Sequence, residues 1–136
     1  MADAATDPFE SDSITVSHDY YMQLPNGTVI PTDDPDQWGM NMVMLRKTGQ
    51  HAVGQTYINA DGFVAPIFIS TVFLGLNHNW RENGPPLIYE TMIFNFGSEE
   101  YQRRYTDRWE AHCGHQAAIN YVRRELTLLP AYGLDP

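Results

Sequence analysis

The sequence IFISTVFLGL at residues 67–76 is the strongest structural signal in the chain. It is nearly all apolar and rich in β-branched and aromatic side chains, a composition typical of a buried strand. Residues 87–94 (LIYETMIF) have the same character, and the ten residues between the two runs can join antiparallel neighbours. We therefore expect residues 67–76 to form a central strand that is covered on both faces and pairs with residues 87–94.

The N-terminal half of the chain predicts hairpins and loops. Asn26-Gly27 separates two β-prone runs at 14–24 and 28–31, and this dipeptide favours a hairpin because both residues tolerate positive φ. Residues 59–62 (NADG) predict a second hairpin between strands at 55–58 and 62–64. We expect a loop at residues 32–39 (TDDPDQWG) and a strand at residues 41–47.

A helix is predicted near the C-terminus, from Thr106 or Asp107 to about Leu128. Asp107 and Glu110 have the spacing of a capping box, and Pro130 limits the helix at its other end. At about 100° per residue, one stripe of this helix collects five side chains. They are Ile119, Val122, Leu126, His112 and His115.

The predicted elements define an α+β fold. Residues 101–105 add a short edge strand, giving an antiparallel sheet of about five or six strands with hairpins. One C-terminal amphipathic helix packs on one face of that sheet. We expect a single domain at residues 14–130, a flexible acidic N-terminus at 1–13 and a tail at 131–136.

The composition is that of a globular protein, with 136 residues, 43% of them hydrophobic and 18% charged. The net charge is −9, and residues 1–36 contain eight acids but no Lys or Arg. We therefore interpret residues 1–36 as an acidic appendage on a nearly neutral domain. The charge argues against broad binding to nucleic acid or anionic membranes. A single cysteine, Cys113, excludes an internal disulfide and a zinc site with several thiolates.

The sequence also predicts the location of the protein. Residues 1–13 lack the basic and apolar regions of a signal peptide, and no apolar run reaches the length of a membrane span. We expect a cytoplasmic protein that is not bound to a membrane.

The polar loop after residue 76 contains most of the candidate ligand-binding residues: Asn77, His78, Asn79, Trp80 and Arg81. An indole offers a face for stacking, while Arg and Asn side chains offer hydrogen-bond donors. This combination suits a nucleotide-like ligand or a protein partner. The alternative is that the indole covers the sheet edge and the polar side chains are solvated.

A small anion is a further candidate ligand. Arg108 lies at the start of the predicted helix, where it would join Arg81 in binding a phosphate or another anion.

The histidines suggest a second kind of site. His112 and His115 are three residues apart on one helix, and with His78 they would supply three metal ligands. Glu90 would add a carboxylate. The competing interpretation is a set of buried histidines that hydrogen bond to protein groups, including a Glu90–His pair. We expect no cofactor.

Part of the chain resembles a family of small uncharacterised proteins encoded by bacteriophages and prophages, especially those of actinobacteria. The resemblance spans residues 67–122 and is carried by STVFLGLNHNW at 70–80, GPPLIYETMIF at 84–94, Arg104-Tyr105 and Gly114-His115. The family often has Asp at the position of Asn77. The resemblance implies a phage origin and action in the cytoplasm of a host cell, and it implies no reaction.

These observations favour a non-enzymatic, phage-encoded binding protein, because no motif for nucleotide hydrolysis, dinucleotide binding or serine hydrolysis is present. Its partner would be a small anionic or nucleotide-like signal or a host protein, as in a counter-defence factor. Two alternatives stay open. One is a metal-dependent enzyme built on the His/Glu cluster. The other is an acidic mimic whose residues 1–36 occupy a basic surface of a nucleic-acid-binding host protein. A homodimer is compatible with the predicted edge strand.

Overall fold

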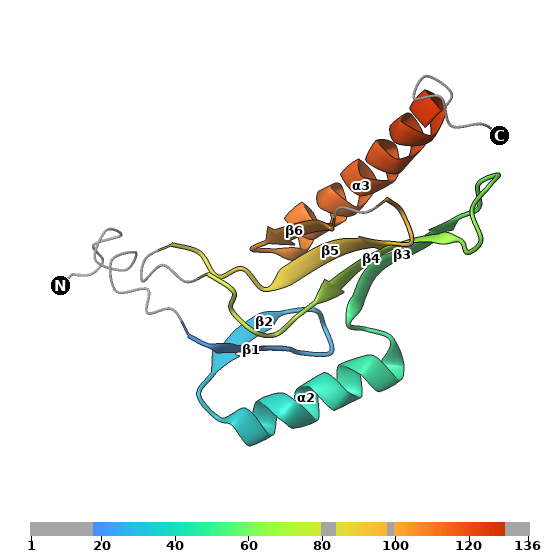
Figure 1. The fold of residues 1–136 in the computed structure, drawn as a ribbon. Coiled ribbons are helices and arrows are strands. Elements are labelled where there is room, and N and C mark those ends of the chain that lie inside the picture. Colours follow the sequence, from blue (N-terminus) through green and yellow to red (C-terminus); the bar gives the residue numbers. More distant parts are fainter. Residues whose placement is uncertain (1–17, 80–83, 98–99, 130–136) are drawn as a thin grey trace.

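The computed structural model describes residues 18–79, 84–97 and 100–129 (Figure 1). Within these ranges, four strands form an antiparallel sheet in the order β3-β4-β5-β6. They are β3 (Ala52–Ile58), β4 (Ile67–Phe73), β5 (Tyr89–Phe94) and β6 (Tyr101–Tyr105). A separate antiparallel pair contains β1 (Tyr20–Gln23) and β2 (Val29–Thr32).

Two helices complete the described fold: α2 (Pro35–Thr48), between β2 and β3, and α3 (Arg108–Leu128), after β6. The α+β class and the C-terminal helix on one face of a sheet are confirmed. The strands divide into two sheets, however, and α2 was not predicted. The expected N-terminus at 1–13 and tail at 131–136 lie outside the described residues.

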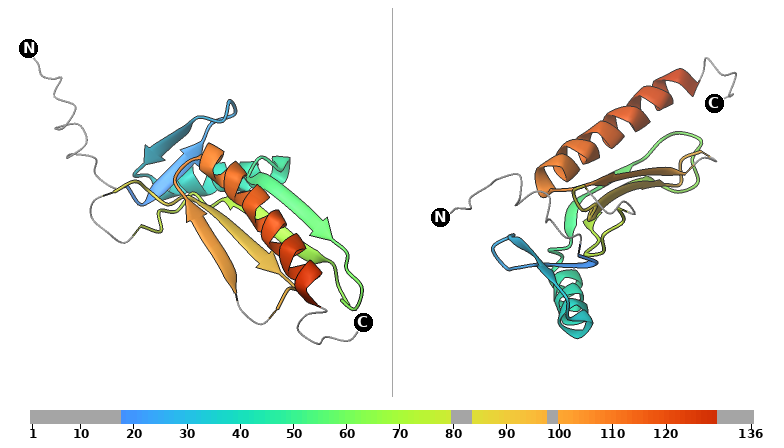
Figure 2. Two further views of the ribbon diagram at one scale, coloured as in Figure 1. Left: turned by 90° about the horizontal axis from the view of Figure 1, so that it is seen from above. Right: turned by 90° about the vertical axis from the view of Figure 1, so that its left-hand side faces the viewer.

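β4 is a central strand of the larger sheet, as predicted, and it pairs with both β3 and β5. Buried and partly buried residues alternate along it, so that Ile69 and Thr71 are buried while Phe68 and Ser70 are partly exposed. Figure 2 shows α3 lying along one face of this sheet, with α2 and the β1–β2 hairpin on the other side. These elements leave Phe68 and Ser70 of β4 partly exposed, so the prediction that both faces of β4 are covered was wrong.

α2 replaces the predicted loop at residues 32–39 and the predicted strand at 41–47. The Asp34 carboxylate accepts hydrogen bonds from the backbone N–H groups of Asp36 and Gln37, and Pro35 begins the first turn. Gly49, with φ of 76°, ends the helix in the left-handed conformation. Most of the apolar residues between these caps are Met and Leu, which are good helix formers, and Leu45 is buried in the core.

The first predicted hairpin is confirmed and the second is partly wrong. β1 pairs with β2 across Asn26-Gly27, and Gly27 has φ of 91°. β3 pairs with β4, so residues 62–64 belong to the connection between them and form no strand.

α3 begins as the sequence predicts. Asp107 Oδ1 accepts from the backbone N–H of Glu110 at 2.8 Å, and Glu110 Oε1 accepts from the N–H of Thr106 at 3.0 Å. The buried stripe includes Ala111, Ala118 and Val122 as well as His115 and Ile119. Because Ala111 and Ala118 belong to this stripe, its centre lies farther from His112 than the sequence predicted. His112 is exposed, and its predicted place in the stripe is wrong.

Among the described residues, no helix is long and apolar enough to cross a membrane.

Candidate functional site

His115 lies between α3 and the four-stranded sheet, where it is almost fully buried. Its Nδ1 is 2.7 Å from the hydroxyl oxygen of Thr71 on β4, and its Nε2 is 2.8 Å from that of Thr56 on β3. Both ring nitrogens therefore have hydroxyl partners. The sequence singled out His115 as a ligand-binding residue, whereas its observed contacts are those of a hydrogen-bonded core histidine.

The hydrogen bonds continue across the sheet. The Thr71 hydroxyl bonds to that of Thr91 on β5, and Thr91 bonds in turn to the side chain of Tyr105 on β6. Thr71 and Thr91 are both completely buried. One network of side chains, the buried network, thus links all four strands to α3: Thr56, His115, Thr71, Thr91 and Tyr105.

Two glycines make room for the buried network. A side chain at Gly54 would come within 2.8 Å of the His115 ring, and one at Gly114 would come within 2.1 Å of the Tyr105 ring. The packing thus explains why Gly precedes His115 in the sequence. The role of Gly54 is visible only from the pairing of β3 with β4.

Burial lowers the pKa of His115, and the nearby His112 lowers it further. The neutral imidazole is therefore favoured, with one ring nitrogen donating a hydrogen bond and the other accepting one. Burial also raises the pKa of Tyr105, against the opposing effect of its hydrogen bond with Thr91. The buried network is uncharged at neutral pH, as its position in the core requires.

Glu90 lies on the other face of the sheet from His115. Its neighbour Thr91 points toward α3, and successive side chains of a strand point to opposite faces. Glu90 accepts a hydrogen bond from Arg104 Nε at 2.9 Å. Glu90 therefore does not pair with His115, and the interpretation of a Glu90–His pair does not hold for this histidine.

His78 is close enough to this ion pair to be affected by it. Burial and the positive charge of Arg104 lower the pKa of His78, while Glu90 acts to raise it.

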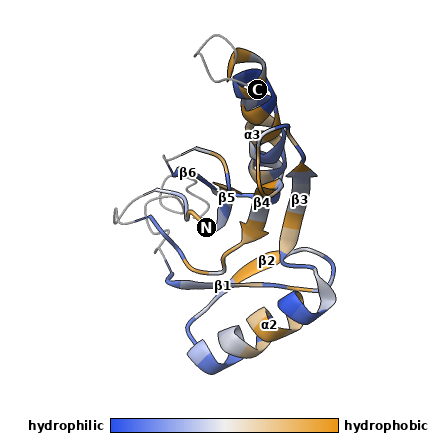
Figure 3. Cartoon of the chain, turned by 45° about the vertical axis from the view of Figure 1, so that its right-hand side comes forward, coloured by the Kyte–Doolittle hydropathy of each residue, from blue (hydrophilic) through white to orange (hydrophobic). Residues whose placement is uncertain are grey.

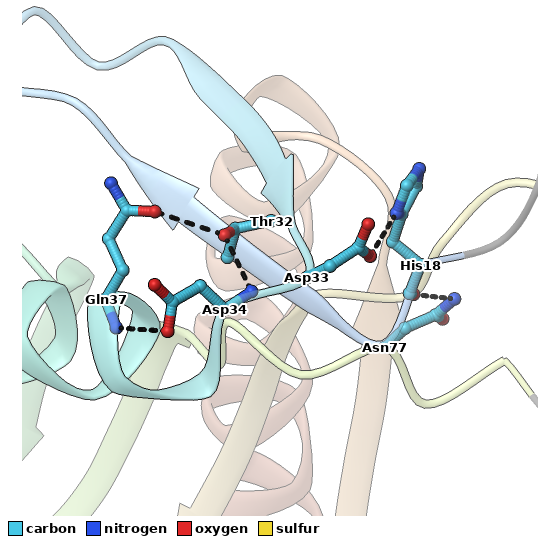
Figure 4. A network of polar contacts seen from close by, with 6 residues as sticks. All are labelled: His18, Thr32, Asp33, Asp34, Gln37 and Asn77. Atoms are coloured by element: carbon cyan, nitrogen blue, oxygen red, sulfur yellow. Dashed lines mark hydrogen bonds and ion pairs between the residues drawn. The ribbon is translucent and has the colours of Figure 1, made fainter.

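Asn77 and Asn79 shape the loop in which they were predicted to bind a ligand. The Asn77 side-chain oxygen accepts hydrogen bonds from the backbone N–H groups of Asn79 and Leu87. The Asn77 side-chain amide donates to the backbone carbonyl of His18 (Figure 4). The Asn79 amide donates to the carbonyl of Pro85 at 2.7 Å. These bonds hold the two ends of the loop together.

The remaining predicted positions do not form one pocket with His115. Trp80 and Arg81 lie outside the described residues. Arg108 is exposed at the start of α3 and hydrogen bonds to the side chain of Tyr89. His112 is also exposed, and its ring lies against that of Trp109. Within the described ranges, no three or more His, Cys, Asp or Glu side chains are grouped to hold a metal ion.

The side of the sheet opposite α3 has a feature that was not predicted. Tyr57, Phe68 and Phe94, from three adjacent strands, stack in a row, which we call the aromatic row. The ring centroids are 4.5 Å apart for Tyr57 and Phe68 and 5.8 Å apart for Phe68 and Phe94. Tyr57 is 64% exposed and Phe94 is 42% exposed. Only the strand register brings these rings together, because each stands alone in the sequence.

The acidic segment was predicted to be an appendage of 36 residues, but half of its acids belong to the fold. Asp34 caps α2, and Asp33 lies 3.2 Å from His18 in the network of Figure 4. The backbone carbonyl of Asp19 accepts a hydrogen bond from Asn77. The other four of the eight acids at residues 1–36 lie outside the described residues: Asp3, Asp7, Glu10 and Asp12.

Comparison with known proteins finds no match to a protein-family model, to a curated protein or to a solved structure. The function must therefore be inferred from the four-stranded sheet itself, which has one face covered by α3 and an aromatic row on the other.

Proposed function

We propose that this is a non-enzymatic binding protein that docks a partner protein on the aromatic row. The observation behind this proposal is the exposure of Tyr57 and Phe94 on either side of Phe68, on the sheet face opposite α3. Aromatic side chains gathered on a surface are typical of the energetic centre of a protein interface.

The geometry of the rings favours a protein over a nucleotide as partner. Stacking on a base requires a free ring face, as on the sheets that bind single-stranded nucleic acid. Here Tyr57 and Phe68 are almost parallel, with an angle of 14° between their planes, so each ring covers a face of the other. The central ring, Phe68, is stacked on both sides, so it offers its edge and not a face to a partner.

The surroundings of the aromatic row support the same choice. Ser70 and Met92 lie on this face by the alternation of β4 and β5, and farther along it Glu90 is paired with Arg104. The charges there are balanced, so this face has no excess of positive charge to select a polyanion. A neutral surface with an apolar centre fits a protein of similar character. The phage resemblance makes a bacterial host protein the expected partner.

A displayed library of bacterial protein fragments tests this proposal with the purified chain as bait. Fragments selected on the wild-type chain should lose binding to a Phe68→Arg bait and keep binding to a Val64→Arg bait. Val64 is a matched control because its side chain is fully exposed in the β3–β4 connection. Selected fragments that bind all three baits equally would contradict docking at the aromatic row.

The nucleotide alternative has its own measurement. A thermal-shift screen with nucleotides and cyclic nucleotides should give no stabilisation of the wild-type chain. Stabilisation that disappears in Tyr57→Ala would instead assign the aromatic row to a small aromatic ligand.

A further inference from the structure

A second surface of the molecule, on α2, exposes apolar side chains and is separate from the aromatic row. Met40, Val43 and Met44 are 71%, 53% and 58% exposed. Their spacing of three and four residues places them on one side of the helix. The opposite side of α2 is buried through Met42 and Leu45. α2 is therefore apolar on two sides, and only one of them is used within the described fold.

Charged residues continue this exposed stripe at both ends. Asp36 lies in the first turn and Lys47 in the last turn of α2. At about 100° per residue, Asp36, Met40, Val43, Met44 and Lys47 fall within an arc of about 100°. We call these five residues the α2 stripe. Figure 3 shows the same arrangement along the helix, with a hydrophobic middle between more hydrophilic ends.

We propose that the α2 stripe binds the α2 stripe of a second copy of this chain, with the two helices antiparallel. In that arrangement the acidic end of each stripe meets the basic end of the other. With the two-fold axis midway between Met40 and Met44, Met40 of one copy faces Met44 of the second copy. Asp36 of one copy then lies beside Lys47 of the second copy.

The charge order is what selects an antiparallel second copy as the partner. A parallel pair would place Asp36 against Asp36 and Lys47 against Lys47, and these contacts are repulsive. The antiparallel pair makes two opposite-charge contacts and also opposes the two helix dipoles. A two-fold interface requires such a self-complementary surface.

The size of the surface sets the strength of the contact. α2 has 14 residues and is about 21 Å long. A pair of such helices covers less than the roughly 800 Å² per partner of a standard interface. The dimer is therefore weak, and it forms as the protein concentration rises.

Sedimentation equilibrium of the full chain, from about 10 µM to about 1 mM, tests the proposal. The wild-type chain should dimerise within this range, and Met44→Glu should weaken dimerisation at least about tenfold, because it places two carboxylates in the apolar centre. A chain that stays monomeric throughout the range would overturn the proposal.

Charge reversal provides the sharper test. Asp36→Lys and Lys47→Asp should each weaken self-association, and the double variant should restore it. A mixture of the two single variants should form a heterodimer, because both of its contacts are then attractive. Arg46→Asp is the matched control, since Arg46 lies outside the α2 stripe, and it should leave dimerisation unchanged. Circular dichroism confirms that each variant keeps its helices.

Self-association through α2 and partner binding at the aromatic row are tested by different measurements, so either can be contradicted without the other. A dimer that is broken by Phe68→Arg but not by Met44→Glu or charge reversal would overturn self-association through α2. Fragment binding at the aromatic row is measured independently with the same Phe68→Arg variant.

Discussion

The two faces of the four-stranded sheet differ in burial, although neighbouring residues of the same strand contribute to both. On the α3 side, Ile69 and Thr71 of β4 are completely buried, and the hydroxyl of Thr71 is bonded within the buried network. On the other side, Phe68 and Ser70 are partly exposed, and Phe68 lies between two other rings. One of the polar side chains predicted from the sequence to form a site, His115, is thus part of the core, whereas exposed apolar side chains form the candidate binding surface.

The largest expected difference between the faces comes from truncating adjacent side chains. Ile69→Ala should lower the free energy of unfolding by about 3–4 kcal/mol, because it leaves a cavity under α3. Phe68→Ala should cost about 1 kcal/mol, since it mainly removes ring contacts at a partly exposed position. Urea denaturation of both variants measures the difference. Equal losses would mean that the two faces are equally covered in solution.

A smaller difference is expected for the hydroxyl groups. Thr71→Val should cost about 2 kcal/mol, because it leaves the buried His115 Nδ1 without its partner and leaves the Thr91 hydroxyl with Tyr105 alone. Ser70→Ala, the neighbouring change on the other face, should stay within about 0.5 kcal/mol. The same denaturation experiment applies. A Thr71→Val variant as stable as the wild type would show that the buried network contributes nothing to stability.

The smallest expected effect is a dependence of stability on pH. The folded pKa of His115 lies below its unfolded value, so near pH 6.5 and below the unfolded chain binds more protons than the folded chain. The free energy of unfolding should therefore fall as the pH decreases from 7 toward 5. The lowered pKa of His78 acts in the same direction from the other side of the sheet.

Two variants separate these contributions. His115→Gln removes the titrating imidazole, and its stability should change less steeply with pH than that of the wild type, whatever its starting stability. His78→Gln should flatten the pH dependence less, because His78 is less buried than His115. Parallel pH profiles for the wild type and His115→Gln would contradict the assignment to His115.

Local sequence signals predicted much of the fold. The central position of β4, its pairing with β5, the first hairpin and the start of α3 follow from β-branched runs, Asn-Gly and the Asp107–Glu110 cap. Each of these signals acts over a few residues, which is why sequence reasoning could use them. The Asp34-Pro35 start and Gly49 end of α2 are signals of the same kind, and they mark a helix where a strand was predicted at 41–47.

The candidate surfaces depend on relations between distant residues. Tyr57, Phe68 and Phe94 meet because three strands pair in one register, and a shift of one residue would move each ring to the other face. His115 is buried because Gly54 and Gly114 allow close packing and because Thr56 and Thr71 lie opposite its nitrogens. The residue types were evident from the chain alone. The tertiary structure decided which of them are buried, because burial depends on the strand register and on which face of the sheet α3 covers.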